Sequence, residues 1–339
     1  MRSELAAALV VVLALAAGCV PELDVDESIV TSPRVVAVRA VPPEVRPGET
    51  VSLEALVLDA AGPVDAPALD WSFCLARFGA DATDDALPAR CAAGDGLSPI
   101  GRGATVEATV PLDACRLFGP DLPPPVPGEP PGRPTSADST GGYALPVVVD
   151  TPGARVVYGV RLRCGLAGAT QEQAATFERR YTRNAAPGVV LETLNDAGAE
   201  PIGEEGLTVP PGGRVELRAR WPACPTLDAC GDAVCGPDED ATGCADDCDV
   251  PAGCTGAERY LRFDPVERAL EVDAETIRVA WFASAGLFDV ERNGALSETP
   301  FVDNAWTAAS PFGDAWLAAV VRDSRGGVAW TVVPARAEE

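Results

Sequence analysis

The cysteines are the residues of this chain whose type and spacing point most clearly to chemistry. Eleven are present, and six of them lie within residues 224–254, among eight acidic residues and no basic one. A segment so short and polar has little hydrophobic surface to bury, so we expect disulfide bonds to hold it, in pairings that the sequence leaves open. The six are Cys224, Cys230, Cys235, Cys244, Cys248 and Cys254.

Two kinds of metal chemistry compete with this interpretation. Clustered cysteines bind zinc in reducing compartments. The uncharged apolar run over residues 5–17, typical of an export signal, and the absence of histidine argue against a zinc site. Carboxylates could bind Ca²⁺, although the segment has no EF-hand or nonapeptide spacing. We favour a solvated acidic knot without a metal, and calcium stays open as the alternative. The candidate calcium ligands are Asp228, Asp232, Asp238, Glu239 and Asp240.

The same segment resembles small modules of the form CGDGxCxPGE…C…DC that occur in secreted bacterial and archaeal proteins. Residues 230–239 read CGDAVCGPDE, with Ala233 and Asp238 at positions that are usually glycine. The resemblance implies a small disulfide-rich insertion.

Catalytic motifs are missing from the sequence. Without histidine there is no Ser-His-Asp or Cys-His arrangement, and no G-x-S-x-G, P-loop or G-x-G-x-x-G motif is present. A carboxylate pair could hydrolyse glycosides, but nothing among the 51 acidic residues singles one pair out. We therefore expect a protein that is not an enzyme and has no cofactor other than the alternative calcium ion.

The first 19 residues have the features of a bacterial lipoprotein signal. Arg2 precedes an uncharged apolar run over residues 5–17, which is too short to cross a membrane. Residues 16–19, AAGC, resemble a lipobox, with Ala16 where leucine is usual. The resemblance implies that residues 1–18 are removed and that Cys19 is lipidated. An ordinary cleaved signal and an uncleaved anchor are the alternatives.

Lipidation of Cys19 leaves ten cysteines, an even number that suits up to five disulfides in an oxidising compartment. We expect the lipid to be the only membrane contact, with residues 19–33 as an acidic tether. Val20 after the cysteine favours the outer over the inner membrane, by resemblance to enterobacterial sorting. The cysteines outside the cluster are Cys74, Cys91, Cys115 and Cys164.

The charge of the chain limits its partners. The net charge is −25, and every basic residue is arginine. Such a surface repels phosphate backbones and anionic lipid heads, so nucleic-acid binding is excluded. It suits a soluble surface, a cation site or a basic partner.

An internal repeat organises the body of the chain. Residues 45–55, VRPGETVSLEA, and 209–219, VPPGGRVELRA, are identical at six of eleven positions. Each copy alternates apolar and polar residues at period two, as a half-buried strand does, and a short apolar strand with a central tryptophan follows. Those tryptophans are Trp71 and Trp281.

This pattern resembles bacterial immunoglobulin-like and polycystic-kidney-disease-like β-sandwich modules. The resemblance implies an all-β fold of two such sandwiches that act as spacers, adhesive modules or protein-binding platforms. Residues 316–333 are typical of a hairpin that turns at residues 323–327. We expect tryptophans to pack in cores or on sheet faces rather than to form a sugar-binding platform, and these are Trp71, Trp281, Trp306, Trp316 and Trp330.

The sequence predicts two domains. The first covers residues 34–186, with a proline-rich excursion at about 76–144 and FERRYTR (177–183) as its last strand. The second covers residues 188–339, with the cysteine-rich insertion at about 222–257. The function we expect is a cell-envelope binding or adhesive module with a protein or glycan partner. A structural spacer or assembly subunit is the second hypothesis, and a carboxylate hydrolase is the third.

Overall fold

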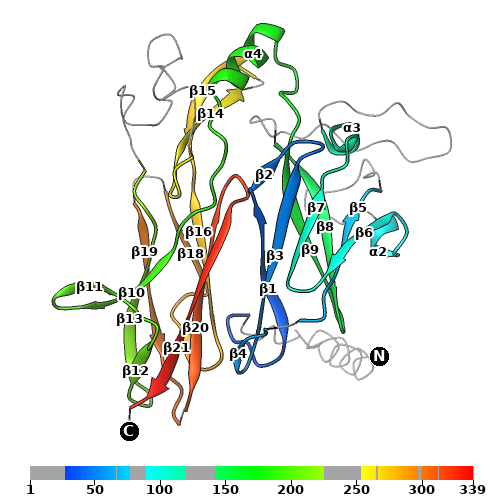
Figure 1. Ribbon diagram of the computed structural model, residues 1–339. Helices are drawn as coiled ribbons and strands as arrows, with labels where there is room; N and C mark the ends of the chain where they lie inside the picture. The colour runs from blue at the N-terminus through cyan, green and yellow to red at the C-terminus, as the bar shows by residue number, and fades with distance from the viewer. Residues whose placement is uncertain are drawn as a thin grey trace, which may run out of the picture.

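The computed structural model describes an all-β protein of two immunoglobulin-like sandwiches (Figure 1), which confirms the predicted fold class. The predicted signal segment, the start of the predicted tether, the proline tract and most of the cysteine-rich insertion lie outside the described residues. The described residues are 27–65, 67–76, 89–119, 142–224, 253–264, 266–296, 299–311 and 313–338.

The N-terminal sandwich consists of two facing sheets. Its strands are β1 (Arg34–Val41), β2 (Glu44–Val45), β3 (Thr50–Asp59), β4 (Gly62–Pro63), β5 (Asp70–Cys74), β6 (Leu97–Arg102), β7 (Thr105–Thr109), β8 (Gly142–Thr151) and β9 (Ala154–Arg163). In one sheet β3 pairs with β1, β4 and β7, and the other sheet has the order β2-β9-β8-β5-β6. The inward residues predicted for β3 are confirmed, because Val51, Leu53, Ala55 and Val57 all lie in the core between these sheets.

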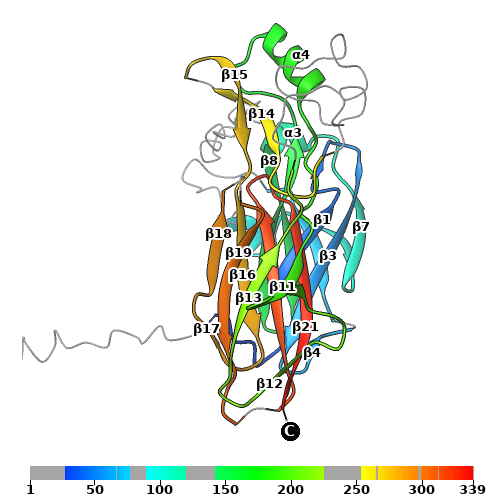
Figure 2. The same ribbon diagram turned by 90° about the vertical axis from the view of Figure 1, so that its left-hand side faces the viewer.

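The C-terminal sandwich has sheets of order β11-β10-β13-β19-β17 and β12-β21-β20-β16-β18. Its two-stranded addition, β14–β15, stands above the sheets (Figure 2). The strands are β10 (Val190–Asn195), β11 (Gly198–Pro201), β12 (Leu207–Val209), β13 (Arg214–Arg220), β14 (Arg259–Asp264), β15 (Ala269–Ala274), β16 (Ile277–Ala283), β17 (Leu287–Phe288), β18 (Arg292–Ala295), β19 (Phe301–Thr307), β20 (Ala315–Asp323) and β21 (Val328–Ala337).

The internal repeat is confirmed, because one sheet of each sandwich has the same strand order. β5 carries Trp71 and lies between β8 and β6, and β16 carries Trp281 and lies between β20 and β18. The edge strands β2 and β12 each pair in parallel with the last strand of their own sandwich. The hairpin predicted over residues 316–333 is the pair β20–β21.

Two sequence predictions about the N-terminal sandwich were wrong. Residues 97–109, expected within the proline-rich excursion, form β6 and β7, which complete both sheets by pairing with β5 and β3. FERRYTR ends a helix instead of forming a strand. This helix, α4 (Gln171–Arg180), begins with a capping box of Thr170 and Gln173 and consists mainly of good helix formers. The other helices are α2 (Ala89–Ala92) and α3 (Ala114–Phe118).

The insertion of the C-terminal sandwich is longer than the sequence indicated. Beyond residues 222–257 it contains the hairpin β14–β15, which packs against α4 of the N-terminal half through a cluster with Phe177, Tyr181 and Leu261 at its centre. α4 has ten residues, and no helix in the described part of the chain could span a bilayer.

The two sandwiches lie side by side and share an apolar interface (Figure 1). Leu56 and Leu58 of β3 point away from the N-terminal core and pack with Trp316 of β20, which is 4% exposed. The indole Nε1 of Trp316 donates to the carbonyl of Asp59, 2.9 Å away. Both faces of β3 are therefore buried, one by its own sandwich and one by the other.

The last part of the segment predicted as a tether belongs to the folded body. Ser28 and Val30 are buried, and Ile29 forms a parallel bridge with Ala283 at the end of β16. The expected tether of residues 19–33 was therefore wrong for residues 27–30, because Ile29 packs against the core of the C-terminal sandwich and Val30 lies in the interface between the sandwiches.

Candidate functional site

The structure places six of the predicted cysteines in disulfide bonds. The pairs are Cys74–Cys91, Cys115–Cys164 and Cys224–Cys254, with Cα atoms 5.8, 5.4 and 5.8 Å apart. Cys224–Cys254 closes the base of the cysteine-rich insertion. The remaining predicted residues lie outside the described residues, and these are Cys19, Cys230, Cys235, Cys244, Cys248, Asp228, Asp232, Asp238, Glu239 and Asp240. No group of metal-binding side chains occurs among the residues that are described.

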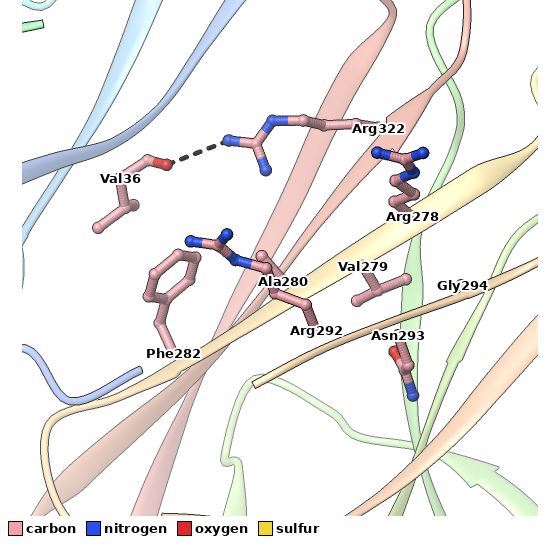
Figure 3. Close-up of a pocket in the computed structure, with 9 residues that line it drawn as sticks. All are labelled: Val36, Arg278, Val279, Ala280, Phe282, Arg292, Asn293, Gly294 and Arg322. Atoms are coloured by element: carbon pink, nitrogen blue, oxygen red, sulfur yellow. Dashed lines mark hydrogen bonds between the residues drawn. The ribbon is translucent and has the colours of Figure 1, made fainter. Parts of the chain in front are cut away.

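A groove of about 640 Å³ lies where the C-terminal sandwich meets the first residues of β1 (Figure 3). Its floor is the outward face of β16, with Ala280 and Phe282, and β16, β18 and β20 each contribute one of its three arginines. The interface with the N-terminal sandwich covers the same sheet at β20 and β21 but leaves this part open. We call it the arginine groove, and its lining residues are Val36, Arg278, Val279, Ala280, Phe282, Arg292, Asn293, Gly294 and Arg322.

The charge of the groove is opposite to that of the whole chain. Arg278 is exposed and Arg322 is partly buried, and neither has a carboxylate partner among the described residues. Arg322 instead donates to the carbonyl oxygen of Val36 at 3.2 Å, which fixes its guanidinium in the groove (Figure 3). Burial, and the nearby charge of Arg292, lower the pKa of Arg322. A bound anion would offset this repulsion.

The third arginine of the groove is paired at the rim. Arg292 contacts the carboxylate of Glu27 at 2.6 Å, and both side chains are largely exposed. Arg34 donates to the backbone carbonyl of Glu27, and its guanidinium lies 5.6 Å from the centre of the Phe282 ring. The N-terminal segment therefore enters the body at the edge of the groove.

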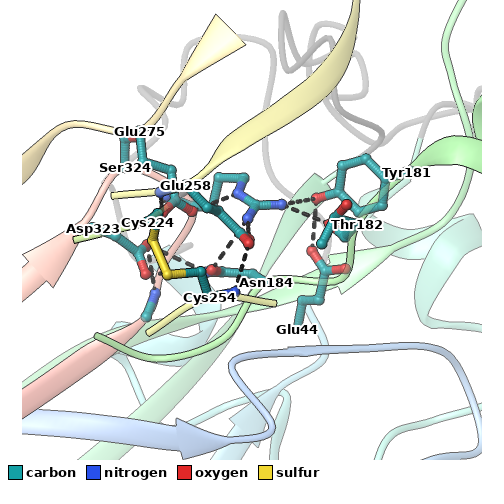
Figure 4. Close-up of polar contacts among 12 residues, drawn as sticks. Glu44, Tyr181, Thr182, Asn184, Cys224, Cys254, Glu258, Glu275, Asp323 and Ser324 are labelled. Atoms are coloured by element: carbon teal, nitrogen blue, oxygen red, sulfur yellow. Dashed lines mark hydrogen bonds and ion pairs between the residues drawn. A yellow bond between two sulfur atoms is a disulfide. The ribbon is translucent and has the colours of Figure 1, made fainter. Parts of the chain in front are cut away.

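A second group of charged residues is buried where the sandwiches meet α4 and the β14–β15 hairpin (Figure 4). At its centre is Arg325, in the turn between β20 and β21 and only 1% exposed. Its Nε donates to Glu275 at 2.6 Å, it forms an ion pair with Glu258, and one NH group donates to Tyr181 at 3.1 Å. We call this group the charge cluster, and its other members are Glu44, Thr182, Asn184 and Asp323.

The charge cluster joins segments that are far apart in the sequence. Tyr181 donates to Glu44 of β2 at 2.9 Å, which extends the network into the N-terminal sandwich. The backbone N–H of Cys254 donates to Glu258 at 2.9 Å, so the base of the cysteine-rich insertion is attached as well. Asn184, in the connection between the domains, donates to Asp323. Because these side chains are buried, the cluster has no surface for a substrate and acts as a structural joint.

Among the described residues the cluster contains four buried carboxylates but only three guanidiniums, because Arg161 and Arg163 also lie there and pair with Glu44. One carboxylate therefore lacks a compensating charge. Burial raises the pKa of Glu275 to about 10, and the charges of Asp323 and Glu44 act in the same direction. Burial also raises the pKa of Asp323 and lowers that of Arg325. We assign a proton to Glu275 at neutral pH.

Protonation of Glu275 predicts an unusual dependence of stability on pH. In the unfolded chain this carboxyl has its usual pKa of 4.5, whereas in the folded protein it keeps its proton up to about pH 10. Its stabilising contribution is complete below pH 4.5 and is lost as pH rises through 10, at up to about 1.4 kcal/mol per pH unit. The variant Glu275→Gln should remove this slope, as measured by urea unfolding at pH 5, 7 and 9.

The matched control is Glu271→Gln, in the same hairpin but partly exposed and paired with Arg262 at 3.0 Å. It should leave the slope unchanged. If the wild type and Glu275→Gln show the same dependence of stability on pH, the proton bound in the folded protein is not on Glu275.

Sequence reasoning missed both groups. The turn over residues 323–327 was predicted, but nothing in the local pattern shows that Arg325 points inward instead of into solvent. One signal was available for the groove: Arg278 and Arg322 interrupt two otherwise apolar strands.

No family model matches this chain, and no curated protein matches its sequence. Solved structures resemble it at low identity. The fibronectin(III)-like modules of Clostridium thermocellum CbhA are 11% identical, with 92% of each chain covered and a TM-score of 0.22. The D0-D1 domain of intimin is 9% identical, with 89% of this chain and 95% of that one covered and a TM-score of 0.19.

The adhesin InvE of Yersinia pseudotuberculosis is 10% identical over 88% of this chain, with a TM-score of 0.21, and the match spans 58% of InvE. The assignment to immunoglobulin-like sandwiches follows from the strand order and not from these scores.

Proposed function

We propose that this chain is a non-enzymatic lipoprotein of the cell envelope that binds an anionic group of a protein or glycan partner in the arginine groove. One observation carries the proposal. In a chain with 51 acidic and 26 basic residues, Arg278 and Arg322 face the same groove and have no carboxylate partner among the described residues. Guanidinium groups bind carboxylate, sulfate and phosphate oxygens through charge-assisted hydrogen bonds.

The cellular location is supported by the cysteines. Disulfides persist in oxidising compartments, and Cys74–Cys91, Cys115–Cys164 and Cys224–Cys254 are such bonds. Together with the lipobox-like residues before Cys19, they favour an exported protein held to the outer membrane by its lipid. Calcium at the cysteine-rich insertion remains the alternative cofactor.

The binding proposal is tested with inorganic pyrophosphate as a probe in isothermal titration calorimetry. Arg278→Ala should weaken binding by about 10- to 150-fold, because it removes one charge-assisted contact worth about 1.5–3 kcal/mol. Arg278 is exposed, so the substitution should not change the folded structure.

The lipid anchor is tested separately. Mass spectrometry of the protein purified from membranes should show an N-terminal diacylglyceryl cysteine.

The control is Arg102→Ala, which removes an exposed arginine of the other sandwich that pairs with Asp70. It should bind pyrophosphate as the wild type does. Equal affinities for wild type and Arg278→Ala, or no measurable binding by either protein, would contradict a role of the groove in anion binding.

A structural spacer is the second candidate function, and the interface between the sandwiches favours it. The apolar contact of Leu58 with Trp316 and the charge cluster around Arg325 hold the two sandwiches in one fixed arrangement. A rigid pair of sandwiches would keep a partner at a constant distance from the membrane.

A further inference from the structure

The arginine groove is bordered by the edge of a sheet. β18 lies at the margin of its sandwich (Figure 2), and among the described strands it pairs only with β16. The N–H of Trp281 donates to the carbonyl of Glu291 at 2.9 Å, and hydrogen-bonded pairs alternate along an antiparallel ladder. The N–H and C=O groups of Arg292 and Gly294 therefore point away from β16, and they have no partner among the described residues.

The same two positions face the groove. Arg292 lies opposite Ala280 and Gly294 lies opposite Arg278, and all four residues line the groove. Both edge residues are exposed. A Cβ at Gly294 would lie 2.7 Å from the carbonyl oxygen of Ile277, so this position has no space for a side chain. Position 294 therefore places no side chain between Arg278 and the free edge.

The equivalent edge of the N-terminal sandwich is protected against strand addition. β6 lies beyond β5 as β18 lies beyond β16, but β6 contains Pro99, which has no N–H. Proline on an edge strand prevents another chain from pairing with it. β18 reads RNGA and has no proline. Of these two equivalent edges, the one beside the groove is therefore able to accept a strand.

We propose that the partner of this chain is a protein that adds an extended acidic segment to the free edge of β18. This inference deepens the proposed anion-binding function and rests on it. In a strand added antiparallel, the residues opposite Arg292 and Gly294 form hydrogen bonds with them and face the groove as well. The added strand lies about 5 Å from β18 and about 10 Å from β16. Carboxylates at those positions are within the combined reach of a glutamate and of Arg292 or Arg278.

Charge and backbone chemistry together favour this occupant. A glycan or a phosphate would use the guanidinium groups but would leave the backbone groups of Arg292 and Gly294 without a regular partner. In strand addition, main-chain hydrogen bonds supply affinity and side chains supply specificity. A second copy of the chain is a poorer occupant, because each copy has a net charge of −25.

The test measures amide hydrogen exchange in the full chain by NMR, with a synthetic octapeptide of alternating glutamate and threonine as the probe. With the peptide at about ten times its Kd, the N–H groups of Arg292 and Gly294 should exchange about tenfold more slowly, because only unbound protein exchanges. Those of Asn293 and Ala295, which face β16, should change little. Pyrophosphate should leave all four unchanged.

A matched peptide with N-methyl groups on its glutamates keeps its charges but loses its hydrogen bonds to the carbonyls of Arg292 and Gly294. It should bind about tenfold more weakly. Arg278→Ala should also weaken binding of the unmodified peptide, whereas Arg102→Ala should not, because Arg102 lies in the other sandwich.

Strand addition is overturned if the octapeptide does not bind, if the N-methylated peptide binds equally well, or if the amides of Arg292 and Gly294 stay unprotected. Each of these results leaves the proposed function to be judged by pyrophosphate binding, whose absence would overturn that function instead. Protection of the same amides at rising protein concentration without peptide would make a second copy the occupant and overturn the acidic partner segment.

Discussion

Arg325→Met should lower the free energy of unfolding by about 3–5 kcal/mol at pH 7, because removing one partner leaves buried charges without compensation. The guanidinium of Arg325 is only 1% exposed and contacts Glu275, Glu258 and Tyr181, whose side chains are buried as well. Methionine fills part of the space but cannot donate to any of them. Urea unfolding followed by tryptophan fluorescence would measure the change.

Two variants separate the loss of charge compensation from other effects. Arg102→Met removes an exposed arginine that pairs with Asp70, and it should cost less than about 1 kcal/mol. Adding Glu258→Gln to Arg325→Met should recover part of the lost stability, because the uncompensated carboxylate is then gone. A loss below about 1 kcal/mol for Arg325→Met would mean that the charge cluster does not hold the sandwiches together.

Trp316→Ala should destabilise the protein by about 3–5 kcal/mol, the range of tryptophan-to-alanine substitutions in cores, although the residue lies in neither sandwich core. Its indole packs against Leu56 and Leu58 of the N-terminal sandwich and donates to the carbonyl of Asp59. The substitution opens a cavity between the domains. We therefore expect thermal unfolding by calorimetry to change from one transition to two, as the sandwiches lose their coupling.

Trp316→Phe keeps much of the apolar volume but loses the hydrogen bond, so it should cost about 1–2 kcal/mol and retain a single transition. Leu287→Ala, on the exposed strand β17, should change stability by less than about 0.5 kcal/mol. A Trp316→Ala protein as stable as Leu287→Ala would show that the interface contributes little.

The two contacts sit at different parts of one interface and have different physical character. The Trp316 region excludes water through apolar packing, and the Arg325 region fixes the angle between sandwiches, α4 and the β14–β15 hairpin through directed hydrogen bonds. The arginine groove lies beside this interface, with Val36 of one sandwich and Arg322 of the other joined at 3.2 Å. A fixed arrangement of the sandwiches therefore also fixes the shape of the groove.

The sequence by itself determined the local strands and their inward faces. Period-two alternation predicted which side of β3 and β13 faces a core, and the repeated V-x-L-x-A pattern predicted two copies of one sandwich. The glycines of residues 323–327 predicted the β20–β21 turn, and the number of cysteines predicted disulfides. These properties depend on backbone geometry and on residues close together in the chain, which a local pattern encodes.

Only the tertiary structure decided what covers the remaining surfaces. The second face of β3 is buried because another domain packs on Leu56 and Leu58. Arg325 is buried because three distant segments, at residues 181–184, 258–260 and 275, close around it. α4 and the β14–β15 hairpin cover each other, although about 80 residues separate them in the chain. Alternation tells which side chains leave a strand together, but it carries no information about which distant surface meets them, and the arginine groove is defined by that meeting.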